Sequence, residues 1–232
     1  MTEQFGFRDI LVGQSPAPTS ESVARREIAA QVRQLTDRLV RMDADEAELR
    51  RVAGVLRQLN QSVAAHPRRD YSQILQRLAA GEGSRQDLLD MLDFEILTGR
   101  ASPLSSAMEL WLDGEAVRGK ASFGLPWQGP PGRVHGGVIG LVMDVLLAKT
   151  QDFFQGWGMT GTLNIRYMAA TPLDADIDLE ARVVRVEGRK LFNEGRIYVA
   201  GRECVHATGI WISAAGDYKW KPAYRKQEVS PA

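Results

Sequence analysis

Residues 129–148 read GPPGRVHGGVIGLVMDVLLA, a loop rich in proline and glycine that runs directly into an apolar helix. The backbone N–H groups of a first helical turn have no partner within the helix, and the positive end of the helix dipole lies there. Gly136 and Gly137 would let a carbonyl group come close to these N–H groups. The segment therefore predicts a helix N-terminus that can polarise a carbonyl and hold a developing oxyanion.

Asp144 is the exception in this helix, which we expect from residue 136 to about 154 and which is apolar on nearly all sides, as buried helices are. A buried carboxylate with no basic neighbour in sequence is costly. It must be paired through the fold or lie where substrate and water reach it. A His-Gly-Gly turn alone is usually only a turn before a helix. A lone Asp in such a helix is more often a satisfied core or interface carboxylate than a catalyst.

Strands are expected on both sides of the helix. Before it, residues 108–112 and 115–123 flank an Asp113-Gly114 turn, which is typical of a β-hairpin. After it, residues 160–171, 176–187, 191–199 and 203–213 have strand-like patterns, and Leu163 and Ile165 alternate with polar residues. This order favours an α+β fold in which an antiparallel sheet packs on one helix.

The first hundred residues have helical periodicity instead. Apolar residues recur every three or four positions along two runs, which places one stripe on each: Ile28, Val32, Leu35, Leu39 and Met42, then Leu49, Val52, Leu56, Leu59 and Val63. Between them, Asp43 and Glu46 have the spacing of a capping box, so we expect two helices rather than one rod. Shorter helices are expected over 71–78, closed by Gly81, and over 85–97, capped by Ser84.

Three regions result from these patterns: a helical extension at 1–99, a domain at 100–216 and a C-terminal tail at 217–232. The extension has either a structural role, in which it packs on the domain or completes an oligomer, or a functional one as a lid or a partner site. We favour the structural role.

Composition narrows the class of protein. The 232 residues include 29 basic and 29 acidic side chains, which argues against a general electrostatic grip on nucleic acid or anionic membranes. No apolar run approaches the about 18 residues of a membrane span. The single cysteine, Cys204, favours a reducing compartment, and the N-terminus lacks a signal-peptide pattern. We expect a cytoplasmic protein with no metal site and no cofactor.

Several motifs in the segment 116–214 resemble those of the PaaI-type acyl-CoA thioesterase family of hotdog proteins, most of all the branch with thioesterase superfamily members 4 and 5. They are GPPGRVHGG (129–137), Asp144, MTGTLNIRY (159–167), TPL (171–173) and VEGRK (186–190). The resemblance implies a hotdog fold, in which an antiparallel sheet wraps round a central helix. It also implies that acyl-CoA is hydrolysed to free acid and CoA, with roles in lipid metabolism.

The resemblance also implies roles for individual residues. Asp144 would be the general base or the nucleophile, and the Gly136 amide would polarise the thioester carbonyl, with Gly137 beside it. His135 would orient the turn or the thioester, and Thr160 would position the attacking water. The active site would form across a homodimer, or within a dimer of dimers.

Binding of the substrate would involve three further residues. Arg189 and Lys190 would hold the CoA phosphates, although two solvated turn charges are an equal alternative. Trp127 would line an acyl pocket, or would be a core or interface residue. A non-catalytic acyl-CoA-binding or regulatory module is the alternative function. A hydratase would need an Asp followed closely by a His, and the sequence contains no such pair.

Overall fold

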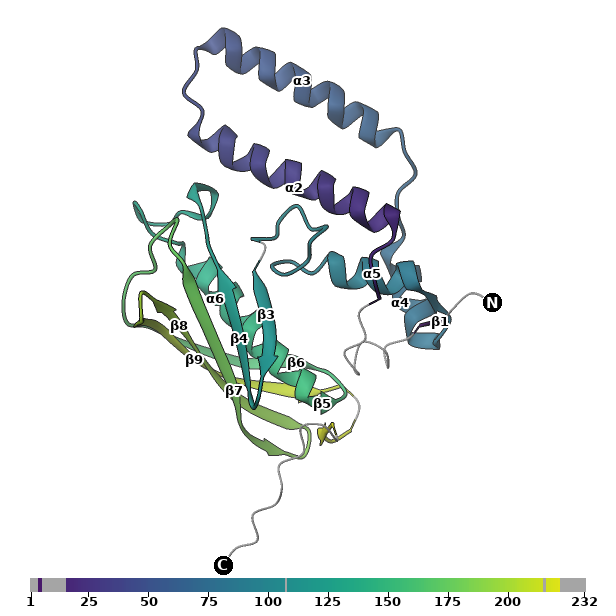
Figure 1. Cartoon of the computed structure of the whole chain (residues 1–232), viewed down its shortest axis with the longest axis vertical. Coiled ribbons are helices and arrows are strands. Elements are labelled where there is room, and N and C mark those ends of the chain that lie inside the picture. Colours follow the sequence, from purple (N-terminus) through teal and green to yellow (C-terminus); the bar gives the residue numbers. More distant parts are fainter. Residues whose placement is uncertain (1–3, 6–15, 107, 215, 222–232) are drawn as a thin grey trace, which may run out of the picture.

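The computed structural model describes residues 4–5, 16–106, 108–214 and 216–221. Figure 1 shows two parts, a curved sheet around one helix and a set of helices that lies to one side of it. Of the expected C-terminal tail, residues 222–232 lie outside the described residues.

A six-stranded antiparallel sheet is the centre of the structure. Its strands lie in the order β3 (Glu109–Asp113), β4 (Ala116–Ala121), β7 (Ile177–Glu187), β8 (Lys190–Val199), β9 (Arg202–Ser213) and β6 (Gly158–Tyr167). Helix α6 (Gly136–Ala148) lies against its concave face (Figure 1). Strand β6 comes last in the order, so one of its edges is unpaired within the described chain. This arrangement confirms the predicted α+β hotdog architecture.

Helix α6 is held close to the sheet by its apolar side and by a glycine on β8. Its buried residues face the sheet: Ile139, Val142, Met143, Leu146 and Leu147. A Cβ on Gly195 would lie only 3.0 Å from Leu147 Cδ2 and 3.1 Å from Met143 Cε, so glycine permits this close approach. The helix position that carries Asp144 is therefore fixed by packing on β8.

The helical stretch ends close to where it was expected, but its type changes. The α-helix stops at Ala148 and a 3₁₀ helix, η2 (Lys149–Phe153), follows directly, so the predicted helical extent to about residue 154 is confirmed. The Thr150 hydroxyl donates to the Leu147 carbonyl at 2.7 Å, and the Asn193 amide donates to the same carbonyl at 3.0 Å. Side chains therefore satisfy a terminal carbonyl that a longer helix would have used.

The extension contains α2 (Ser20–Arg41), α3 (Glu46–Ala64), α4 (Tyr71–Ala80) and α5 (Arg85–Asp93). The predicted break between α2 and α3 is confirmed, but the predicted cap at Asp43 is wrong. Asp45 is the N-cap, and its carboxylate accepts a hydrogen bond from Glu48 N at 2.9 Å. The backbone is extended at Met42, where α2 ends. Of the two aspartates that follow, the later one, Asp45, caps α3.

The predicted caps at Gly81 and Ser84 are confirmed. Gly81 ends α4 with a φ of 70°, and Ser84 forms a capping box with Asp87 at the start of α5. Helix α5 ends at Asp93 rather than residue 97. The Glu95 carboxylate accepts hydrogen bonds from Leu97 N at 3.1 Å and Thr98 N at 2.8 Å, which draws those two amides out of the helical pattern.

Polar contacts attach the extension to the hotdog domain. Arg33 on α2 donates to the Ser102 carbonyl at 2.8 Å, and Arg41 lies 3.4 Å from Asp174. Two short strand pairs complete the fold: β1 (Gln4–Phe5) with β2 (Gly83–Ser84), and β5 (Phe154–Gln155) with β10 (Lys219–Trp220). Among the described helices, none combines the length and the apolar character that crossing a membrane requires.

Candidate active site

The loop before α6 is clamped at several points. His135 N donates to the Trp127 carbonyl at 2.9 Å, and Val134 N donates to the Thr171 carbonyl at 2.9 Å. A Cβ on Gly129 would lie 2.8 Å from the His135 Cα, so only glycine fits there. The turn that starts α6 is thus held rigidly between 3₁₀ helix η1 (Leu125–Trp127) and the chain near residue 171.

His135 is the N-cap of α6, and its side chain decides which amide of the first turn is free. Its Nδ1 accepts a hydrogen bond from Gly137 N at 3.0 Å. The neutral imidazole therefore carries its proton on Nε2. The Gly136 N–H has no hydrogen-bond partner among the described residues. This N–H is a donor at the positive end of the helix, suited to a carbonyl oxygen that gains negative charge.

Asp144 lies two turns further along the same helix and is partly buried. Its Oδ1 accepts a hydrogen bond from the Thr160 hydroxyl at 2.8 Å. No cation of the described chain forms an ion pair with this carboxylate, and both of its sequence neighbours are apolar. A carboxylate that is held in place but lacks a counter-charge can take up a proton or attack a carbonyl.

Tyr167, at the end of β6, contacts the site in a way that the sequence analysis missed. Its hydroxyl donates to the Gly136 carbonyl at 2.9 Å. A Cβ on Gly136 would meet the Tyr167 ring at 3.9 Å, an ordinary contact distance. The alternation of β6 places Tyr167 on the same side as Leu163 and Ile165. Its hydroxyl, on an otherwise apolar face, was the one feature of the sequence that could have indicated this contact.

Gly136 and Asp144 are brought to the same side of the molecule but not to the same point. They are eight residues apart in one helix, which corresponds to about 12 Å along its axis. A thioester carbonyl bound at the Gly136 N–H therefore lies beyond the reach of the Asp144 carboxylate of the same chain. One chain therefore holds two separate groups of residues, Gly136 with Tyr167 and Asp144 with Thr160.

The three remaining residues of the predicted site lie apart from these groups. The exposed Arg189, at the turn between β7 and β8, donates to the Ser213 carbonyl at 2.8 Å. Lys190 is exposed at the start of β8. Trp127 packs edge-to-face on Phe123 and lines a cleft of about 580 Å³ between α2 and residues 122–127. The lining of that cleft does not include Asp144, Thr160 or Gly136.

Within the part of the chain that the structure describes, no group of three His, Cys, Asp or Glu side chains is arranged to hold a metal ion. Cys204 is buried, as expected of a small apolar side chain.

Curated proteins that match the chain are acyl-coenzyme A thioesterases. Rat (Rattus norvegicus) acyl-coenzyme A thioesterase THEM4 is 36% identical over 96 residues, which cover 40% of this chain and 41% of that protein. Human (Homo sapiens) acyl-coenzyme A thioesterase THEM5 is 32% identical over 88 residues, which cover 37% and 35%. The matched part thus spans about two fifths of the length of these relatives or less. No protein-family model matches the chain.

A solved structure is similar over a much larger part of the chain. The crystal structure of a thioesterase superfamily protein superimposes with a TM-score of 0.67 and 29% sequence identity, covering 86% of this chain and 93% of that one. Coverage of this extent includes much of the helical extension as well as the hotdog domain. The resemblance that the motifs indicated is therefore confirmed at the level of fold and superfamily.

Proposed function

We propose that this chain, a hotdog-fold protein of the thioesterase superfamily, hydrolyses an acyl-CoA thioester to the free acid and CoA. One observation carries the proposal: an unpartnered N–H at a helix N-terminus and a carboxylate without a counter-charge occur in the same helix. The first suits the oxygen of a polarised thioester, and the second suits a base or nucleophile. A module that only binds acyl-CoA has no need of the second group.

In the reaction we propose, the Gly136 N–H donates a hydrogen bond to the carbonyl oxygen of the thioester and stabilises the tetrahedral intermediate. With Asp144 as base, the carboxylate takes a proton from water while the water oxygen bonds to the carbonyl carbon. The C–S bond then breaks and the proton passes to the CoA sulfur, which gives a carboxylic acid and a thiol. The Thr160 hydroxyl fixes the carboxylate, since it already donates to Oδ1.

Asp144 as nucleophile is the second form of the same proposal. Its oxygen would bond to the carbonyl carbon, expel CoA and leave an acyl anhydride that water hydrolyses. A single turnover in ¹⁸O-labelled water can identify the nucleophile form. Label in Asp144 requires an anhydride that water attacks at the aspartyl carbonyl, whereas a base, or an anhydride that water attacks at the acyl carbonyl, leaves the label only in the product acid.

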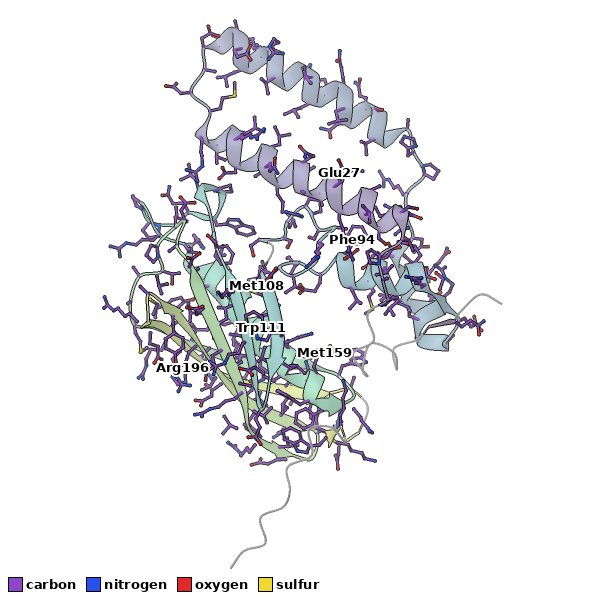
Figure 2. All side chains as sticks on the ribbon, viewed as in Figure 1. Glu27, Phe94, Met108, Trp111, Met159 and Arg196 are labelled. Carbon is purple, nitrogen blue, oxygen red and sulfur yellow. The ribbon has the colours of Figure 1, made fainter. Side chains whose placement is uncertain are left out.

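We propose further that each complete active site is shared by two chains of a homodimer. The separation of about 12 Å between Gly136 and Asp144 supports this, because a two-fold axis could bring the Asp144 half-site of one chain to the Gly136 half-site of the other. The unpaired edge strand β6 supports it as well. Met159, which precedes Thr160 on β6 and is labelled in Figure 2, is 65% exposed, and Tyr167, which bonds the Gly136 carbonyl, is 55% exposed.

Arg189 and Lys190 remain our proposed contacts for the CoA phosphates. The Arg189 guanidinium uses Nε and Nη2 for the Ser213 carbonyl, which leaves Nη1 for an anion. Lys190 forms no ion pair within the described chain. The buried thiol of Cys204, the single cysteine, fits the cytoplasmic location that we propose.

The test is CoA release, followed with a thiol reagent across acyl-CoA substrates of different chain length. We expect Asp144→Asn to lower kcat by about 10²-fold or more. The matched control is Asp178→Asn, an exposed carboxylate on β7, which should leave kcat unchanged. Binding of every substrate without release by the wild-type chain would favour the non-catalytic module, and full activity of Asp144→Asn would exclude the role of Asp144.

Shared sites have their own test. Asp144→Asn and Gly136→Pro should each be inactive, but a mixture of the two should recover activity. Random mixing of dimers gives about half heterodimers, each with one intact site, so about a quarter of wild-type activity is expected. No recovery, with heterodimers demonstrated by tagged chains, would place both groups of each site in one chain.

A further inference from the structure

Helices α2 and α3 leave most of their apolar side chains exposed. Of the nineteen large apolar side chains that are exposed in the described chain, nine belong to these two helices. They are Val23, Ile28, Val32, Leu39, Val40, Leu49, Val55, Leu59 and Val63. Soluble proteins rarely expose contiguous apolar surface of this kind unless it binds something.

The apolar stripe of α2 does not face the hotdog domain. The inward-facing residues of α2 are Arg26, Ala29 and Arg33. Ala29 is buried, Arg26 bonds Asp93 at the end of α5, and Arg33 bonds the Ser102 carbonyl of the hotdog domain. At about 100° per residue, the stripe through Ile28, Val32, Leu35 and Leu39 lies roughly 120° away from the mean direction of these three residues. Packing on the domain therefore leaves the stripe uncovered, and Ile28 is 64% exposed.

Helix α3 is even more isolated. It contains no buried residue and makes no extensive contact with any other described element, α2 included. Figure 1 shows it on the outer side of α2, away from the sheet. A helix of 19 residues gains most of its stability from an apolar face packed on a partner, and no described element buries any residue of α3.

We propose that the partner is a second copy of this chain, with the two α3 helices packed antiparallel about a two-fold axis near Leu56. The α2 stripes would flank them, which gives an antiparallel four-helix arrangement. The inference is independent of the proposed enzymatic activity.

The spacing of the α3 stripe is self-complementary. Leu49, Val52, Leu56, Leu59 and Val63 recur at 3-4-3-4 intervals, the pattern of a bundle seam. Measured from Leu56, they stand at −7, −4, 0, +3 and +7, so reversal about Leu56 brings Leu49 opposite Val63 and leaves Val52 and Leu59 offset by one residue, about 1.5 Å along the axis. An isologous interface requires this property of a single surface.

Charge selects the antiparallel direction. Residues 43–51 contain four acidic and two basic side chains, whereas residues 57–69 contain three basic side chains and no acidic one. Antiparallel packing brings the acidic end of one α3 to the basic end of the other, and parallel packing would bring like charges together. Asp43 and Arg68 form no ion pair within the described chain, so both are available.

The first experiment measures the mass of the full chain by light scattering over a range of concentrations. We expect Leu59→Glu to raise by at least about tenfold the concentration at which association through α3 occurs, while any dimer formed through the hotdog domain persists. Gln58→Glu is the matched control, because it adds the same charge at an exposed position of the opposite face and should leave association unchanged. Circular dichroism checks that α3 stays helical.

An unchanged mass profile for a helical Leu59→Glu variant would overturn the proposal. If that variant also has an altered KM for long acyl chains, α3 acts as a lid instead.

Cross-linking gives a second readout that does not depend on a disruptive substitution. Leu56→Cys should form an interchain disulfide, because the axis places residue 56 of both chains together. Val63→Cys should not, because two such residues would lie about 20 Å apart. Cys204 is buried and does not interfere. Equal cross-linking at both positions, or none at residue 56, would contradict the antiparallel arrangement.

Discussion

The Thr160 hydroxyl donates a hydrogen bond of 2.8 Å to the Asp144 carboxylate, and this bond joins the central helix α6 to the edge strand β6. It is the one hydrogen bond that fixes the orientation of the carboxylate within the described chain, since no cation pairs with Asp144. The two residues lie on separate elements, so the packing of α6 on the sheet decides whether they meet. The bond connects the stability of the fold with the proposed chemistry.

Thr160→Val should lower kcat/KM by about tenfold to a hundredfold, because a hydrogen bond to a charged group contributes about 1.5–3 kcal/mol. The loss arises from a carboxylate that is no longer held in one orientation. Thr160→Ser keeps the hydroxyl and should lose much less. Steady-state CoA release provides the measurement, and equal rates for the Val and Ser variants would contradict the role of this bond.

Gly136→Pro should reduce kcat by about 10²–10³-fold, the usual effect of losing one oxyanion donor. Proline suits the first helical position, and His135 already has the extended backbone that a following proline requires (φ −61°, ψ 137°). The substitution therefore removes an N–H without breaking α6. Gly136→Ala keeps the N–H, and its Cβ would meet Tyr167 at 3.9 Å, so it should cost far less. A Pro variant as active as the Ala variant would exclude the amide from catalysis.

Two glycines should respond to alanine in opposite directions. At Gly195 a new Cβ would lie 3.0 Å from Leu147 and 3.1 Å from Glu180 O, so Gly195→Ala should destabilise the fold by about 1–3 kcal/mol. At Gly140 the nearest atom would be Ile165 Cδ1 at 3.6 Å, so Gly140→Ala should add up to about 1 kcal/mol of helix propensity. Urea unfolding measures both. Similar midpoints for the two variants would mean that α6 does not pack on β8 as described.

Acid should weaken the helical extension through Asp87. The hydrogen bond from Arg77, aided by those from the backbone and side chain of Ser84, lowers the pKa of Asp87 to about 2. A folded-state pKa below the unfolded value stabilises the fold above about pH 4, by about 2 kcal/mol, and this contribution disappears as the pH falls from about 4 to 2.

The variant Asp87→Asn checks this dependence. It should melt at a lower temperature than wild type at pH 7, and the difference should shrink as the pH approaches 3. Glu82→Gln changes an exposed carboxylate nearby and should leave the melting temperature unchanged. A difference that persists undiminished at pH 3 would mean that the ionised form of Asp87 is not what stabilises the extension.

Much of the fold was predictable because local signals and tertiary structure agree. The hairpin turn, the alternation around Leu163 and Ile165, and the glycine at position 81 each act over a few residues. The turn itself lies at Gly114-Glu115, one residue later than the predicted Asp113-Gly114, because Asp113 still pairs with Ala116 in the sheet. The apolar character of residues 136–148 required a central helix, because no other placement could bury so many apolar side chains. The motifs from His135 to Thr160 identified the superfamily on the same local basis.

Packing between distant segments decided the features of the structure that local sequence signals did not predict. The Tyr167 bond to Gly136 and the Asn193 bond to Leu147 join residues that are 31 and 46 positions apart, so no local pattern encodes them. The rise of α6 along its axis, with the helix anchored by Gly195, separated Gly136 from Asp144 by about 12 Å. Long-range geometry also turned the α2 stripe outward, because another side of α2 made the contacts instead: Arg26 with Asp93 of α5, and Arg33 with the Ser102 carbonyl of the hotdog domain.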